Sequence, residues 1–401
     1  MLNSQNNIIK KVMKPVHLST QARYRIAVSS FFFIQGIVFA SWASRIPDIK
    51  SALSLSDGFL GALLFAVPVG QLCAMALSGW LVARYGSKKM LILSAILYPA
   101  FLVWLGFAAN VWQLAAGLFL FGMAGNLSNI SINTQGVDVE RLYRKRSIMA
   151  SFHGLWSLAG FCGGVISSVV SGMKITPAWH FVMIFCFTFI LLLSMKDSAV
   201  PRDFKTKKTS GGKPNKIFTK PDRYIFLLGF TAFASMSCEG TMFDWSGVYF
   251  QSVFNAPENF IRLGYISFMC TMALGRFTAD RFVNRFGPCA VIRVSGLIMF
   301  TGLILSVALP SLLFATTGFL LIGAGTSSVV PLCYSMAGRS KAMQASVALA
   351  AVSAIGFFGF LIGPPVIGFI AQYFGLRASF SLIAFIALSA VFIAPYLKEK
   401  Q

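Results

Sequence analysis

Two carboxylates lie inside an apolar segment of this chain, where a carboxyl group can do proton chemistry. Glu239 and Asp244 fall within residues 224–251, whereas the rest of the 12 acidic residues lie at or near the ends of apolar runs. A charged carboxylate in the middle of a bilayer costs a few kcal/mol, so a carboxyl group there can hold and release a proton. Glu239 is the first proton-coupling candidate. A structural acid bound to a neighbouring helix is the alternative.

Two further titratable residues are candidates for proton coupling. Asp244 lies five residues after Glu239, about 140° further around a helix, so the two are not expected to form one carboxylate pair. For Asp244 the alternative is a simple anchor at the outer mouth. His153 can titrate near neutral pH, although a lone histidine is more often a structural group.

Uncharged polar side chains offer ligands for a neutral polar solute. Asn126, Asn129 and Asn133 are three and four residues apart, which places them on one stripe of a helix. At membrane depth such a stripe is either a row of substrate ligands or a contact between helices. Gln35 and Gln71 lie near the middle of their segments and add donors and acceptors. The aromatic residues that could stack on a sugar face are Trp42, Trp156, Trp245 and Tyr334.

The composition shows what must position these residues. Of the 401 residues, 56% are hydrophobic and 11% are charged, against about 25% charged in an average soluble domain. Together with a mean hydropathy of +0.73, this excludes a water-soluble protein and predicts an integral membrane protein. A net charge of +22 could indicate a nucleic-acid binder, but the basic residues lie between apolar segments, so we expect no nucleic-acid partner.

Twelve segments reach the roughly 20 apolar residues that a transmembrane helix needs. Their length and internal glycines indicate helices rather than strands, so the predicted class is all-α. The segments are approximately 24–45, 57–82, 89–108, 111–135, 147–171, 178–195, 224–251, 260–282, 289–309, 311–336, 343–371 and 376–397.

Lysine and arginine predict the orientation of these spans. With the N-terminus inside, 28 of the 34 basic residues lie on cytoplasmic segments, 5 lie outside and Arg293 lies within a span. By the positive-inside rule, both termini are therefore cytoplasmic. The predicted domains are a cytoplasmic segment (1–23), a six-helix bundle (24–196), a basic cytoplasmic linker (197–223) and a second six-helix bundle (224–397).

The two halves of the sequence repeat at an offset of 201 residues. The stretch 80–86 resembles 281–287, residues 121–124 resemble 322–325, and 165–166 match 366–367. Three separated matches at one offset indicate a duplication into two parallel six-helix repeats. This pattern resembles the major facilitator superfamily of transporters.

A short loop carries a second resemblance to that superfamily. Residues 79–89 are similar to its Gly-x-x-x-Asp-Arg-x-Gly-Arg-Arg motif, although Ala83 stands at the acidic position. In the second copy Asn284 stands there, one turn after Asp280, which could substitute for the acid. The resemblance implies gating roles, and Gly363-Pro364-Pro365 is either a bending element or a static kink. The gating candidates are Gly79, Arg84, Gly86, Asp280, Arg285, Gly363, Pro364 and Pro365.

Three motifs are similar to the bacterial inner-membrane group typified by YbjJ, which is distantly similar to sugar–proton symporters. They are residues 40–47 (ASWASRIP), 239–245 (EGTMFDW) and 363–365 (GPP). The resemblance implies the fold and a transporter of the bacterial inner membrane with several spans. We also expect a monomer, and no enzymatic activity, because the sequence has no nucleotide loop, metal cluster or nucleophile motif. Its expected partners are a small-molecule solute, protons and the lipid bilayer.

The expected function is transport of a small polar solute, such as a sugar or related metabolite, by proton-coupled alternating access. Antiporters of the superfamily that this chain resembles usually have Gly-Pro in the span 147–171, so the resemblance implies symport where that pair is lacking. One alternative is a proton-driven efflux transporter for amphipathic compounds, and another is a membrane sensor or enzyme. The seven cysteines show no metal-ligand spacing, so neither a metal nor a cofactor is expected.

The predicted orientation can be tested by labelling single cysteines. In a cysteine-free background, a Ser210→Cys variant should react with a membrane-impermeant maleimide only after the cells are opened, because the linker is expected in the cytoplasm. Met173→Cys, between the fifth span and the sixth, should react in intact cells and serves as the control. Labelling of Ser210→Cys from outside would contradict the topology.

Overall fold

The computed structural model describes residues 19–143, 148–201, 222–309, 311–340 and 345–397, and their regular structure is entirely helical. The α-helices of the first half are α2 (Thr20–Ala43), α3 (Ile46–Ala52), α4 (Asp57–Leu64), α5 (Ala66–Tyr85), α6 (Ser87–Gly106), α7 (Val111–Leu142), α8 (Met149–Gly172) and α9 (Pro177–Met195). Those of the second half are α10 (Arg223–Phe254), α11 (Leu263–Phe286), α12 (Pro288–Ala308), α13 (Leu312–Gly338), α14 (Ala345–Phe374) and α15 (Leu376–Ile393). Three short 3₁₀ turns are η1 (Lys196–Ser198), η2 (Glu258–Phe260) and η3 (Ala394–Leu397).

The predicted all-helical membrane architecture is confirmed. Among the described residues, 11 helical segments are long and apolar enough to cross a membrane. The segment expected at 260–282 corresponds to α11, which falls outside that set because charged residues such as Arg276 and Arg281 lie along it. With 24 residues, α11 is nevertheless about 36 Å long, enough to span a hydrocarbon core of about 30 Å.

Backbone packing repeats at the offset seen in the sequence. Gly86 and Gly287, 201 residues apart, both end a helix with positive φ (90° and 81°), a conformation that favours glycine. A Cβ atom on Gly122 would lie 2.1 Å from the carbonyl oxygen of Val67. A Cβ atom on Gly323, 201 residues after Gly122, would lie 2.1 Å from the carbonyl oxygen of Phe268, 201 residues after Val67. Glycine therefore permits the same close helix contact in each half.

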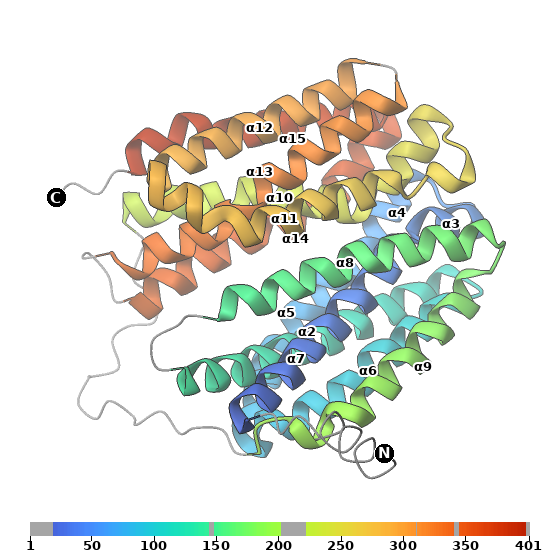
Figure 1. Cartoon of the computed structure of the whole chain (residues 1–401). Helices are drawn as coiled ribbons and strands as arrows, with labels where there is room; N and C mark the ends of the chain where they lie inside the picture. The colour runs from blue at the N-terminus through green and yellow to red at the C-terminus, as the bar shows by residue number, and fades with distance from the viewer. Residues whose placement is uncertain (1–18, 144–147, 202–221, 310, 341–344, 398–401) are drawn as a thin grey trace, which may run out of the picture.

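The helices form two sets that meet along a shared face (Figure 1). Helices α2 to α9 pack mainly with one another, as do α10 to α15, and between the sets α4 packs against α14 and α8 against α11. The linker predicted at 197–223 lies mostly outside the described residues, and the domain limits stay a prediction. Below, the end of the bundle with Thr20, Gly86, Gly287 and Arg223 is called the linker end, and the end with α3 and η2 the far end.

The two sets touch closely at the far end, and Figure 1 shows them diverging toward the linker end. A Cβ atom on Gly61 of α4 would lie 2.6 Å from the carbonyl oxygen of Pro364, and one on Gly368 of α14 would lie 2.9 Å from the Cα of Gly61. One turn away, the backbone N–H of Gly58 donates to Oε1 of Gln372 at 3.2 Å. Small residues thus let the backbones of the two sets meet directly.

An ion network also joins the sets at the far end. Asp48 of α3 pairs with Arg45 at 3.2 Å and with Arg262, which precedes α11 in the other set. Both arginine side chains are only 1% exposed. Arg45 also bonds to Nδ1 of His180 at 3.3 Å and to the carbonyl of Ile175 at 3.0 Å. Asp48 is therefore the shared counter-ion of two buried guanidinium groups, one from each set.

Removing the Asp48 charge should open the far end. Asp48→Asn removes the ion-pair partner of two buried arginines, which should cost the closed arrangement roughly 3–5 kcal/mol. Spin labels at Met173→Cys and Ser252→Cys, two exposed far-end positions in opposite sets, should move apart by several Å in a pulsed dipolar measurement. Asp197→Asn removes an exposed carboxylate at the linker end and should leave the distance unchanged. An unaltered distance in Asp48→Asn would show that the network does not hold this end closed.

Candidate functional site

A cavity of about 860 Å³ lies between the two helix sets. Its wall includes residues of α2, α4, α5, α6, α7 and α8 from the first set and of α10, α11, α13 and α14 from the second. Toward the linker end the wall reaches Asn133, Met149 and Val283, and toward the far end it reaches Leu64 and Asp244. The glycine contact between α4 and α14 and the Asp48 network lie further toward the far end than the cavity wall does.

The central feature of the wall is an ion pair between α10 and α11. Oε1 of Glu239 accepts a hydrogen bond from Nη2 of Arg276 at 3.1 Å, and Nη1 of Arg276 donates to Oγ of Ser157 on α8 at 2.7 Å. The Arg276 guanidinium also lies over the Trp156 ring, 5.6 Å from its centroid. Because Ser157 and Trp156 belong to the first set, Arg276 connects Glu239 to the opposite half of the protein.

Arg276 is a site residue that the sequence reasoning missed. It was counted among the basic residues of a cytoplasmic segment, and the structure instead places it in the cavity wall. Its removal from that count leaves the majority of basic residues on the same side. The available signal was its position inside the span predicted at 260–282, where an ionisable residue requires a partner.

Asp244 lines the same cavity as Glu239 but has different surroundings. Among the described residues, neither a hydrogen bond nor an ion pair reaches its carboxylate. The sequence prediction that Glu239 and Asp244 do not form one carboxylate pair agrees with this arrangement, because Glu239 is bound by Arg276. The proton-coupling roles of both acids stay predictions.

The predicted amide ligands all line the cavity: Gln35, Gln71, Asn126, Asn129 and Asn133. Oδ1 of Asn126 is buried and has no hydrogen-bond partner among the described residues. Nδ2 of Asn133 donates to the carbonyl oxygen of Asn129 at 2.8 Å and to its Oδ1 at 3.2 Å. These bonds lie within α7, so in this structure the stripe faces the cavity and does not join two helices.

The aromatic predictions divide into two groups. Trp42, Trp156 and Tyr334 line the cavity. Trp245 does not: its side chain is fully buried in the core, with Nε1 unpaired among the described residues. The expectation that Trp245 stacks on a substrate is therefore corrected. The reason is its position one residue after Asp244, about 100° further around α10, which turns it away when Asp244 faces the cavity.

Further aromatic residues complete the wall. Phe243 contacts Phe39 edge to face at 5.0 Å between ring centroids and lies parallel to Phe360 at 6.3 Å. Trp156 contacts both Phe39 and Phe243 at 6.0 Å. These four rings come from α2, α8, α10 and α14, so aromatic packing also bridges the two sets.

His153 lies on the cavity wall one helical turn before Ser157. Its ring is edge-on to Phe32, with ring centroids 5.2 Å apart, and the side chain is exposed. Its backbone carbonyl accepts a hydrogen bond from Oγ of Ser157 at 3.2 Å. The geometry places it beside the Arg276 contact, and its coupling role stays a prediction.

The predicted gating residues whose side chains are described lie away from the cavity wall. Gly86 forms the turn between α5 and α6, while Arg84 and Arg285 are exposed at the linker end and Gly79 has open space around it. The side chain of Asp280 is outside the part of the chain whose side chains are described. Gly363, Pro364 and Pro365 lie within α14, where the Pro364 carbonyl meets Gly61 at the far end. Their gating roles stay predictions.

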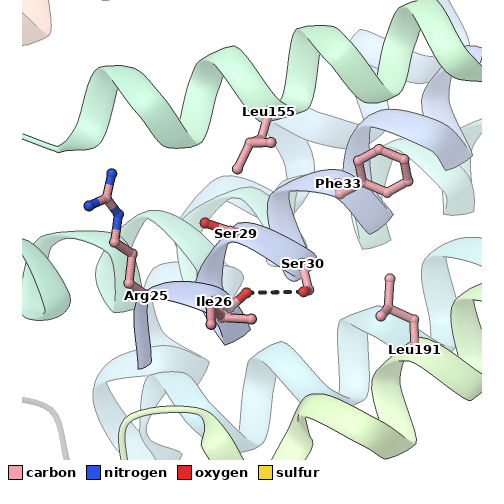
Figure 2. A pocket seen from close by; sticks show the side chains of 7 residues that line it. All are labelled: Arg25, Ile26, Ser29, Ser30, Phe33, Leu155 and Leu191. Carbon is pink, nitrogen blue, oxygen red and sulfur yellow. Dashed lines mark hydrogen bonds between the residues drawn. The ribbon is translucent and has the colours of Figure 1, made fainter. Parts of the chain in front are cut away.

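A smaller pocket of about 300 Å³ lies beside α2 (Figure 2), and it shares no lining residue with the central cavity. Its lining comes from α2 with one leucine each from α8 and α9: Arg25, Ile26, Ser29, Ser30, Phe33, Leu155 and Leu191. The Ser30 hydroxyl donates to the carbonyl of Ile26 at 3.0 Å, so its hydrogen is used within α2. The Arg25 guanidinium lies 5.6 Å from the Tyr143 ring centroid. This pocket contains no carboxylate or amide, unlike the central cavity.

The unpaired oxygen of Asn126 predicts a loss of binding on substitution. Asn126→Ala should weaken the affinity for a solute identified by a thermal-shift screen about two- to tenfold, the value of one neutral hydrogen bond. Ser131→Ala is the matched control, because it removes an unpaired buried oxygen of α7 that lies outside the cavity wall. Equal affinity of Asn126→Ala and the parent protein would exclude Asn126 as a ligand.

Comparison with solved structures shows the fold. The nucleoside transporter NupG matches with a TM-score of 0.72 at 14% identity, over 94% of this chain and 100% of that one. A bacterial homologue of the human lysosomal transporter Spinster, in an inward-facing and occupied conformation, matches with a TM-score of 0.69 at 16% identity, over 94% and 96% of the two chains.

Comparison of sequences shows the family. An uncharacterised MFS-type transporter of Yersinia pestis is 32% identical over 374 residues, which are 93% of this chain and 94% of that protein. The membrane protein MosC of Rhizobium meliloti is 32% identical over 385 residues, 95% of this chain and 93% of that protein. The family model of the Major Facilitator Superfamily matches residues 27–347 and 254–401. The chain is therefore a multi-pass membrane protein and a transporter of the major facilitator superfamily, not an enzyme.

Proposed function

We propose that this protein moves a small polar solute across the bacterial inner membrane by proton-coupled alternating access. The observation that carries the proposal is the cavity between the two helix sets, which holds an acid–arginine pair and five amide side chains in a wall built from both sets. A solute bound there contacts both halves, so their relative motion can expose it to either side. Because one chain supplies the whole wall, a monomer is sufficient.

The Glu239–Arg276 pair is the proposed coupling element. Protonation of Glu239 removes its charge and so breaks its ion pair with Arg276. Arg276 also donates to Ser157 and lies over Trp156 in the opposite set, so a change in its position alters a contact between the halves. A proton on Glu239 thereby acts on the interface whose rearrangement transport requires.

The proposed orientation has both termini in the cytoplasm, which makes the linker end the cytoplasmic one. The structure, closed at the far end by the Asp48 network, is then the form with its cavity directed to the cytoplasm. The resemblance to the YbjJ-like group supports a bacterial inner-membrane transporter and, more distantly, a sugar–proton symporter. Symport of a sugar or a related metabolite is the finer form of the proposal.

Efflux of amphipathic compounds is the second candidate, and the apolar part of the wall favours it. Apolar side chains of the cavity include Phe32, Leu72, Met75, Met236 and Phe357. Symport and efflux differ in the sign of the flux. Under an inward proton gradient, a symporter accumulates solute inside vesicles that retain the cellular orientation, whereas an efflux transporter lowers the internal concentration.

Replacing Glu239 should separate coupling from transport. Glu239→Gln keeps the side-chain shape and imitates the protonated acid, so proteoliposomes should lose accumulation driven by a pH gradient. Counterflow exchange without a gradient should persist, since it needs no net proton movement. Accumulation equal to that of the parent would exclude Glu239 as the coupling residue.

Two controls distinguish this outcome from a folding defect. Glu239→Gln leaves Arg276 without its ion-pair partner, which can destabilise the protein by roughly 3–5 kcal/mol. The double variant Glu239→Gln, Arg276→Gln removes both charges and should recover thermal stability without recovering accumulation. Asp197→Asn, an exposed acid outside the cavity, should behave as the parent in all three measurements.

A further inference from the structure

The charges on the cavity wall do not balance. The wall residues with a full formal charge at neutral pH are Glu239, Asp244 and Arg276, while His153 is a neutral imidazole in that count. Arg276 is paired with Glu239 and donates to Ser157, and neither contact involves Asp244. Asp244 is thus a wall carboxylate that the described residues leave without a hydrogen-bonding or ionic partner.

Asp244 lies at the enclosed end of the cavity. It shares a face of α10 with Gly240, four residues before it, and with Gly247, three residues after it. A Cβ atom on Gly240 would meet the Phe360 ring at 2.9 Å, and one on Gly247 would meet Pro47 of α3 at 2.6 Å. The Phe360 contact belongs to the cavity wall and the Pro47 contact to the far-end closure, so Asp244 lies between them.

The cavity that Asp244 lines also has aromatic residues in its wall. Phe39, Trp42 and Phe243 all line this cavity, and Phe243 directly precedes Asp244. Aromatic ring faces attract cations, most strongly where water is excluded. Trp156 already has the Arg276 guanidinium over its ring, whereas the described residues place no protein cation over Phe39, Trp42 or Phe243. A carboxylate that no protein cation neutralises, in a cavity wall that also contains aromatic side chains, is the chemistry that recognises an ammonium group.

We propose that Asp244 binds a protonated amine of the transported solute, and that the substrate class is a hydroxylated organic cation. The amine lies at the enclosed end against Asp244, and the hydroxyl groups reach the amides of Asn126, Gln35 and Gln71. A carboxylate solute is disfavoured, because the arginine of the wall is already paired and Asp244 repels an anion. The inference rests on the proposed function and names the substrate class of that same cavity.

The test uses two series of solutes, each with an amine, a neutral and an acid member built on the same carbon skeleton. Purified protein in nanodiscs is titrated at pH 6.5 with glucamine, sorbitol and gluconate, and with glucosamine, glucose and glucuronate, and binding is followed by calorimetry. In at least one series the amine should bind at least about tenfold more tightly than the neutral solute. This ratio corresponds to the free energy of one hydrogen bond to a charged group. The acid should bind most weakly of the three.

Two variants at position 244 test whether Asp244 causes the preference for the amine. Asp244→Asn should reduce the ratio of amine affinity to neutral-solute affinity to about one. The affinity for the neutral solute should stay unchanged, and this unchanged affinity also shows that the variant is folded. Asp244→Glu keeps the charge and should retain the preference, and Asp197→Asn should match the parent. No preference for the amine in either series, or a preference that persists in Asp244→Asn, would overturn the proposal.

Binding and transport distinguish this inference from the proposed function. If the amine binds through Asp244 but a pH gradient drives no accumulation, the proposed coupling fails and the assignment of Asp244 stands. If a neutral solute accumulates with the pH gradient and Asp244→Asn leaves every affinity unchanged, the transport proposal stands and this assignment fails.

Discussion

One shared carboxylate joins the two halves of this transporter at the far end. Asp48 neutralises Arg45 in the first helix set and Arg262 in the second, and both arginines are almost completely buried. Removing a guanidinium from water is costly unless a counter-ion and further hydrogen bonds replace the lost solvation. The glycine contact between α4 and α14 brings the backbones together at this same end. The two halves are therefore held by charge and by close packing at the far end, and the cavity lies on the other side of that contact.

A second charged link lies deeper in the protein and has a different character. Arg276 pairs with Glu239 within its own set and reaches Ser157 and Trp156 in the other set. The Asp48 network and the Arg276 contacts are at different depths, so motion of one half against the other strains both. Only the Arg276 link has its carboxylate on the wall of the cavity, where a proton or a solute can reach it. This difference is why we propose the Arg276 link, and not the Asp48 network, as the coupling element.

The duplication supplies the cavity wall in pairs, and the two halves then differ in chemistry. Wall positions 35, 42, 75 and 156 correspond, at the offset of 201 residues, to wall positions 236, 243, 276 and 357. The amides Asn126, Asn129 and Asn133 correspond to Ser327, Val330 and Tyr334, which also line the cavity. The acids Glu239 and Asp244 correspond to Val38 and Ala43. Hydrogen-bonding capacity is thus concentrated in the first half and ionic capacity in the second.

The sequence by itself determined the membrane class, the spans, the repeat and the depth of Glu239, because each depends on local composition or on position within one helix. Helical phase also placed the asparagine stripe on a single face. The partner of Glu239 is 37 residues away on α11, and the partner of Asp48 is 214 residues away beyond another set of helices. The charges of α11 were therefore interpreted as topology signals, and Trp245 was interpreted as a ligand although α10 turns it into the core. Only the tertiary structure decided these points, because an ion pair or a cavity wall depends on which helix faces meet, and no local pattern encodes that.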